Sequence, residues 1–144
     1  MKLLSHASLS RLLISTIMGL GLMACSIGHN PEPAKDTANS LYAAVAAGDT
    51  EKLLSYYDEA FYQQVSREDY LALLDKIYKK VGAYQSHNLE GWQVSELDGH
   101  GEVYTLTYTV KYANYLTTEA LTMTSDDPPR LIGHSYNSTA FIPD

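Results

Sequence analysis

The most constraining feature of the chain is the segment GEVYTLTYTVKY, residues 101–112, in which residue types alternate strictly. Successive side chains of a β-strand point to opposite faces, so this order separates large apolar side chains from threonine and lysine. The apolar face carries Tyr104, Leu106, Tyr108, Val110 and Tyr112. A strand with one apolar and one polar face is typical of an antiparallel sheet that covers a core on one side.

Three further strands are expected around this segment. AYQSHNLEGWQVSEL, residues 83–97, precedes it, with an interruption or bulge near Gly91, and DGHG at 98–101 is the turn between the two. YLTTEALTMTS, residues 115–125, follows it, and DDPP at 126–129 turns the chain into RLIGHSYNS at 130–138. The pattern predicts a four-stranded meander.

The residues before this meander have helical spacing and predict three helices. The first runs from a cap at Asp36 to Gly48, and the second takes residues 51–57 and continues loosely toward Val65. The third covers 67–81, because apolar residues recur every three or four positions after a capping box at Ser66–Asp69. Helices followed by strands predict an α+β fold, with three N-terminal helices packed on a curved four-stranded antiparallel sheet.

The N-terminus carries a targeting pattern. Lys2 and Arg11 precede an uncharged run, residues 12–23, that is too short for a membrane span but fits a secretory signal peptide. Leu22-Met23-Ala24-Cys25 resembles the lipobox of bacterial lipoproteins. That resemblance implies signal cleavage between Ala24 and Cys25, followed by acylation of Cys25, the only cysteine in the chain. An ordinary secreted protein, or an N-terminal anchor helix with an incidental Cys25, is the alternative.

The predicted organisation is a signal peptide at 1–24, a lipidated tether at 25–35 and a single domain at 36–144. Ser26 is not the aspartate that retains lipoproteins in the inner membrane, so the resemblance implies a lipid anchor in the outer membrane, facing the periplasm. Loss of Lys2 and Arg11 changes the net charge from −7 to −9. An acidic domain repels phosphate backbones, so we expect no nucleic acid partner.

The domain pattern is similar to that of the nuclear transport factor 2-like, or cystatin-like, superfamily. The segments that carry this likeness are LYAAVAAGDTEKLLSYY, IYKKVGAY, VYTLTYTVKY and LIGHSYNS, within residues 36–140. The likeness implies helices in the concave face of a curved sheet and a cone-shaped cavity. One departure is that Arg130 or Leu131 stands where the family usually carries an aromatic residue.

The strand pattern suggests which side chains line such a cavity. The candidate pocket residues are Trp92, Tyr104, Tyr108, His134 and Tyr136. His134 beside a tyrosine hydroxyl could act as an acid or base, although a strand histidine is more commonly a packing residue. Glu119 shares the face of Leu121 and Met123 and could be an inward carboxylate, but we expect it to be an outer or edge charge.

No other chemistry is indicated. His87, His100 and His134 lack metal-ligand spacing, so neither a metal nor a cofactor is expected, and no catalytic residue is assigned. The first hypothesis is a non-enzymatic envelope module that is held to the membrane by acyl chains on Cys25 and binds an envelope protein or a small apolar ligand. The second is an isomerase- or dehydratase-like enzyme using His134 and a tyrosine. Homodimerisation through the threonine face is compatible with the first.

Overall fold

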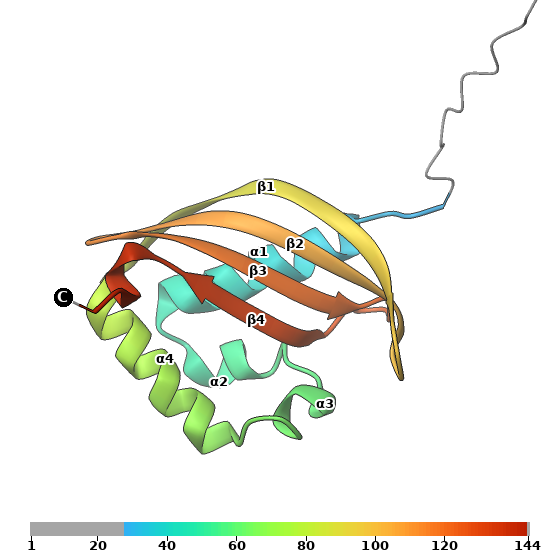
Figure 1. Ribbon diagram of the computed structural model, residues 1–144, viewed down its shortest axis with the longest axis horizontal. Helices are drawn as coiled ribbons and strands as arrows, with labels where there is room; N and C mark the ends of the chain where they lie inside the picture. Colours follow the sequence, from blue (N-terminus) through green and yellow to red (C-terminus); the bar gives the residue numbers. More distant parts are fainter. Residues whose placement is uncertain (1–27, 144) are drawn as a thin grey trace, which may run out of the picture.

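The structure, a computed structural model, describes residues 28–143. A curved sheet arches over the helices, which all lie on its concave side (Figure 1). The elements are α1 (Glu32–Ala47), α2 (Thr50–Leu54), α3 (Glu59–Tyr62), α4 (Arg67–Val81), β1 (Tyr84–Leu97), β2 (Gly101–Tyr112), β3 (Leu116–Thr124), β4 (Leu131–Asn137) and the 3₁₀ helix η1 (Thr139–Phe141). The predicted α+β class and four-stranded antiparallel sheet are confirmed.

The sheet follows the chain order β1-β2-β3-β4, so β1 and β4 are its edges. The alternation in β2 holds, since the five apolar residues predicted to share one face are all buried. The predicted interruption in β1 is also present, as a shift of the β1–β2 register between Leu89 and Gly91. These two features of the sequence therefore fix the inward face of the sheet.

The predicted second helix is wrong in extent, because the chain forms two short helices, α2 and α3, over that region. Tyr57 lies between them and forms a parallel β-bridge with Leu131, the first residue of β4. The Asp58 amide donates to the Leu131 carbonyl at 2.7 Å, and the Leu131 amide donates to the Tyr56 carbonyl at 2.9 Å. Asp58 then caps α3 by accepting from the Ala60 amide. This bridge to the sheet breaks the helix that the spacing suggested.

The start of α1 differs from prediction as well. The helix begins at Glu32, four residues before the expected cap at Asp36, so residues 32–35 are helical and not part of an extended tether. Pro31 occupies the N-cap, and Pro33 falls in the first turn, where a missing amide proton leaves no hydrogen bond unmade. Ala24 and Cys25 lie outside the described residues. Within residues 28–143 no helix has the length and apolar character to cross a membrane.

Helix α4 matches its prediction. The Ser66 hydroxyl accepts from the Asp69 amide at 3.1 Å, as a capping box requires. Its last residue leads into Gly82, which has a φ of 88° and lies where a Cβ atom would be 2.9 Å from the Ala113 Cβ. Glycine is needed there because a larger residue would be strained and would collide with the β2–β3 turn. The tight turn places α4 under the sheet.

Candidate functional site

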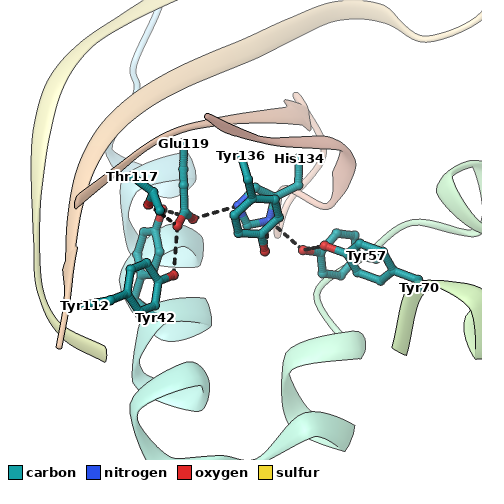
Figure 2. Close-up of polar contacts among 8 residues, drawn as sticks. All are labelled: Tyr42, Tyr57, Tyr70, Tyr112, Thr117, Glu119, His134 and Tyr136. Carbon is teal, nitrogen blue, oxygen red and sulfur yellow. Dashed lines mark hydrogen bonds and ion pairs between the residues drawn. The ribbon is translucent and has the colours of Figure 1, made fainter. Parts of the chain in front are cut away.

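The centre of the concave face contains a carboxylate, Glu119 on β3, that is 0% exposed. Its prediction as an outer or edge charge is wrong, because β3 lies between β2 and β4 and is not an edge strand. Glu119 has the same parity as Leu121 and Met123, which are also completely buried. Figure 2 shows it surrounded by polar side chains from the sheet and from α1. A buried carboxylate needs hydrogen-bond donors around it, since an unpaired buried charge would strongly destabilise the fold.

Four donors satisfy the Glu119 carboxylate. Its Oε1 accepts from the Tyr112 hydroxyl and the Thr117 hydroxyl, both at 2.8 Å. Its Oε2 accepts from the Tyr42 hydroxyl at 3.0 Å and from His134 Nε2 at 2.9 Å. Burial alone would raise the pKa of Glu119, but these hydrogen bonds, led by the one from His134, outweigh it and hold the pKa below its ordinary value. The group is therefore an ionised, fully coordinated carboxylate at neutral pH.

Local sequence explains how these groups converge. Thr117 and Glu119 are two apart on β3 and so point to the same face. Tyr112 ends the alternating apolar face of β2. His134 pairs with Leu121, two residue pairs along the β3–β4 ladder from the Glu119–Tyr136 pair and therefore on the same face of the sheet. Helix α1 supplies Tyr42 from the opposite side of the core, so the carboxylate is held by the sheet and by a helix together.

His134 links this carboxylate to a second set of hydroxyl groups. The hydroxyl of Tyr57 is 2.7 Å from His134 Nδ1 and 2.6 Å from the hydroxyl of Tyr70 on α4. The Tyr136 ring stacks on the imidazole with centroids 4.2 Å apart, and its hydroxyl is 3.3 Å from Nδ1. A continuous hydrogen-bonded chain thus runs from α4 through His134 to Glu119, as Figure 2 shows.

The phenols in this chain stay protonated over the whole physiological range. Burial, and then the negative charge of Glu119, raise the pKa values of Tyr42 and Tyr112 far above the usual value. Burial likewise raises the pKa values of Tyr57, Tyr70 and Tyr136. A neutral phenol keeps its O–H group and can always donate a hydrogen bond, so these tyrosines act as fixed hydrogen-bond donors.

The structure brings together only part of the predicted pocket. His134 and Tyr136 meet at the carboxylate. Tyr108 packs in the core against Tyr42, with ring centroids 5.4 Å apart. Trp92 is 39% exposed at the β1 edge, where its ring lies 6.4 Å from that of Tyr104. The five residues do not line one cavity.

Sequence reasoning did not assign to the pocket the residues that complete the centre. They are Glu119, Tyr42, Tyr57, Tyr70, Tyr112 and Thr117. A signal for Glu119 existed in its parity with Leu121 and Met123. Tyr112 and Thr117 share the inward parity of their strands. No sequence signal indicated that Tyr57 lies beside His134.

A second histidine lies at the other edge of the sheet. His87 on β1 donates from Nε2 to Asn39 Oδ1 at 2.9 Å, and its Nδ1 accepts from the Tyr84 hydroxyl at 2.5 Å. Its ring stacks on Tyr42 with centroids 4.4 Å apart. Burial lowers the pKa of His87, so the fold favours its neutral form.

Two surface hollows flank α4. One, of about 440 Å³, lies between α4 and the α1–α2 turn and has an apolar floor that includes Leu53, Leu71 and Leu74. The other, of about 420 Å³, is lined by Leu73, Ile77, His134, Tyr136 and Phe141, between α4 and the C-terminal end of the sheet. His134 lies at the base of the second hollow, yet its side chain is only 1% exposed.

The chemical capacity of the centre is limited by its coordination. An acid or base must reach the proton of a substrate, and both nitrogens of His134 and both oxygens of Glu119 already have protein partners.

In the described residues no group of three or more potential ligands could hold a metal ion. Comparisons with protein-family models, with curated proteins and with solved structures find no match to this chain.

Proposed function

We propose that this chain is a lipid-anchored protein of the bacterial envelope whose single domain is a non-enzymatic binding or accessory module facing the periplasm from the outer membrane. The lipobox-like residues Leu22–Cys25 support the anchor. The curved antiparallel sheet with helices in its concave face supports a nuclear transport factor 2-like domain. Neither feature alone assigns an activity, because one fold serves many functions.

The observation that carries the non-enzymatic reading is the state of the Glu119–His134 pair. The two side chains are 0% and 1% exposed, and each of their polar atoms has a partner inside the protein. A buried pair of this kind specifies how helices and strands pack, since breaking it leaves a buried charge without a partner. The pair and its hydrogen-bond partners therefore hold β3, β4, α1 and α4 together inside the core.

The hollow of Leu73, Ile77, His134, Tyr136 and Phe141 supports a binding role. Its open, largely apolar lining suits a small apolar ligand or an apolar side chain of an envelope protein. Leu73 at its rim is 47% exposed, so its side chain is accessible to a ligand or partner that occupies the hollow.

Site-specific photo-crosslinking of the lipidated protein in its own envelope tests this proposal. A photoreactive residue replacing Leu73 should give a stoichiometric product with a protein or an apolar ligand. The matched control replaces Leu116, which is 59% exposed in the β2–β3 region, and should give much less. Absence of any stoichiometric product at position 73 contradicts the binding role. The anchor is tested separately, since Cys25→Ser should release the protein from the membrane fraction.

The enzyme alternative has one observation in its favour, which is that His134 and Tyr136 border the same apolar hollow. Acylation of histidines by diethylpyrocarbonate distinguishes the two readings. In the folded protein His100, which lies in the β1–β2 turn, should react, and His134 should react only after unfolding. Reaction of His134 at a rate close to that of His100 would favour an enzyme with an accessible base.

A further inference from the structure

The domain is fastened close to the predicted lipidation site. Helix α1 starts at Glu32, and before it His29 Nδ1 lies 3.1 Å from Glu102 Oε1 on β2. His29, three residues before the start of α1, is therefore attached to the sheet. Only Ser26 and Ile27 separate Cys25 from Gly28, where the described chain begins.

This spacing limits where the domain can be. Three residues span at most about 11 Å, even when fully extended. The headgroup layer on one side of a bilayer is roughly 6 Å thick. A domain of about 100 residues has a radius of gyration of about 13 Å. The tether is therefore shorter than the radius of the domain. If Cys25 carries acyl chains in the bilayer, the domain cannot rotate far enough to bring its opposite end to the membrane.

The attached end has surface features that suit a lipid headgroup layer. It comprises the start of α1 and the β1–β2 turn, which lie on the same side of the molecule in Figure 1. Trp92 lies beside His29 and Glu102 in one shallow depression and is 39% exposed. Leu97, just before the turn, is 43% exposed. Tryptophan is enriched at membrane–water interfaces because its ring is apolar while its N–H needs a polar partner.

The charge of this end selects the kind of bilayer. Glu96 and Asp98 are exposed near the turn, and Glu102 lies beside His29. Carboxylates at the surface are repelled by anionic headgroups, so this end suits a zwitterionic leaflet.

We infer that the end formed by residues 28–31 and the β1–β2 hairpin is the membrane-facing surface of the domain, with Trp92 at the level of zwitterionic headgroups. The opposite end, with the β2–β3 turn and the hollow between α4 and η1, then faces away from the bilayer. This inference rests on the proposed lipidation of Cys25 and adds to it the orientation of the domain.

The chain has one tryptophan, so its native fluorescence reports the position of Trp92 alone. The full-length protein, processed in cells and purified, is reconstituted into phosphatidylcholine–phosphatidylethanolamine vesicles with and without lipids brominated near the headgroup. Trp92 should lose most of its emission in the brominated vesicles. A matched control combines Trp92→Phe with Tyr115→Trp, because Tyr115 has almost the same exposure, 38%, and lies about 20 Å away along the sheet, just after the end of β2. Emission from position 115 should be unchanged.

A second variant moves the domain without altering its surface. Insertion of twenty Gly/Ser residues between Ile27 and Gly28 gives a tether of about 25 Å root-mean-square length, which should restore most of the Trp92 emission. Unquenched Trp92, or equal quenching at positions 92 and 115, would overturn the inferred orientation if mass spectrometry shows acylated Cys25 and the protein floats with the vesicles. Protein without acyl chains that does not float would overturn the proposed anchor and the orientation together.

Discussion

The two edge strands of the sheet each carry a histidine in an aromatic frame, and the two sites differ in one partner. His134 on β4 and His87 on β1 both place Nδ1 against a tyrosine hydroxyl, from Tyr57 and Tyr84. Both rings also stack on a tyrosine, with centroid distances of 4.2 Å and 4.4 Å. At Nε2, however, His134 meets a carboxylate and His87 meets an amide oxygen.

The depth of each site explains this difference. The side chain of His134 is 1% exposed, whereas His87 is half-buried and its Asn39 partner is exposed. At the rim of the sheet a neutral hydrogen bond satisfies His87, because water can hydrogen-bond any polar group that the protein leaves unpaired there. In the core the histidine is joined to a charged group that needs three further donors. Failure of the inner site should therefore cost much more than failure of the rim site.

The strongest test of the comparison removes the inner carboxylate. Glu119→Ala leaves buried donors on His134, Tyr42 and Tyr112 without an acceptor, and should lower the free energy of unfolding by about 3–5 kcal/mol. Urea denaturation followed by circular dichroism measures this loss. Glu96→Ala, at an exposed position of β1, is the control and should change stability by less than about 0.5 kcal/mol. Equal effects in the two variants would contradict a stabilising role for the centre.

A smaller effect is expected from the hydroxyl that joins His134 to α4. Tyr57→Phe removes one oxygen and leaves the Tyr70 hydroxyl and His134 Nδ1 without this partner. The expected loss is about 1–3 kcal/mol, measured by the same denaturation. The rim counterpart, Tyr84→Phe, should lose less because that hydroxyl is partly exposed. A greater loss for Tyr84→Phe would reverse the proposed ranking of the two sites.

Acidification should separate the sites by pH. The folded pKa of His87 lies below its ordinary value of 6.5, so the unfolded chain takes up its proton first and stability falls as pH drops below about 6.5. The folded pKa of Glu119 lies below 4.5, so its stabilisation is present above that pH and is lost on further acidification. Thermal unfolding between pH 8 and 3 should show both losses. His87→Gln should remove only the upper one, while His100→Gln should keep both.

The smallest change is expected at the neutral partner. Asn39→Ala removes the acceptor of His87 Nε2 on the exposed face of α1, where water can replace it. The free energy of unfolding should fall by less than about 1 kcal/mol. A loss comparable to that of Glu119→Ala, measured by denaturation under the same conditions, would show that the rim site is not solvated as the comparison requires.

How far the sequence leads depends on whether the signal is local. The strict alternation of residues 101–112 and the capping box at Ser66 are local, and both predict the observed elements. The helix expected over 51–57 fails because Tyr57 is tied to Leu131, which is a long-range contact. The predicted start of the first helix is wrong because Pro31 and Pro33 are typical of an extended linker but are also compatible with the first turn of a helix.

The candidate site shows the same limit more sharply. His134 and Tyr136 are both predicted to line the pocket, and their rings stack. The role of Glu119 was misjudged, although its parity pointed inward, because a charge in a strand is ordinarily placed outside. An inward carboxylate is stable here because donors from α1, β2, β3 and β4 surround it. Their convergence depends on the fold as a whole, which no short pattern contains.

The break in the β1 register has a consequence for how copies of this protein behave at high concentration. A flat strand with a free edge can pair with the same edge of another copy and begin an aggregate. In β1 the pairing slips between Leu89 and Gly91, with Glu90 exposed at the irregularity. The backbone N–H and C=O groups along the free edge of this fourteen-residue strand are therefore irregularly spaced, and the charge of Glu90 lies near its middle. The bulge makes β1, the longest strand within residues 28–143, a poor template for continuing the sheet.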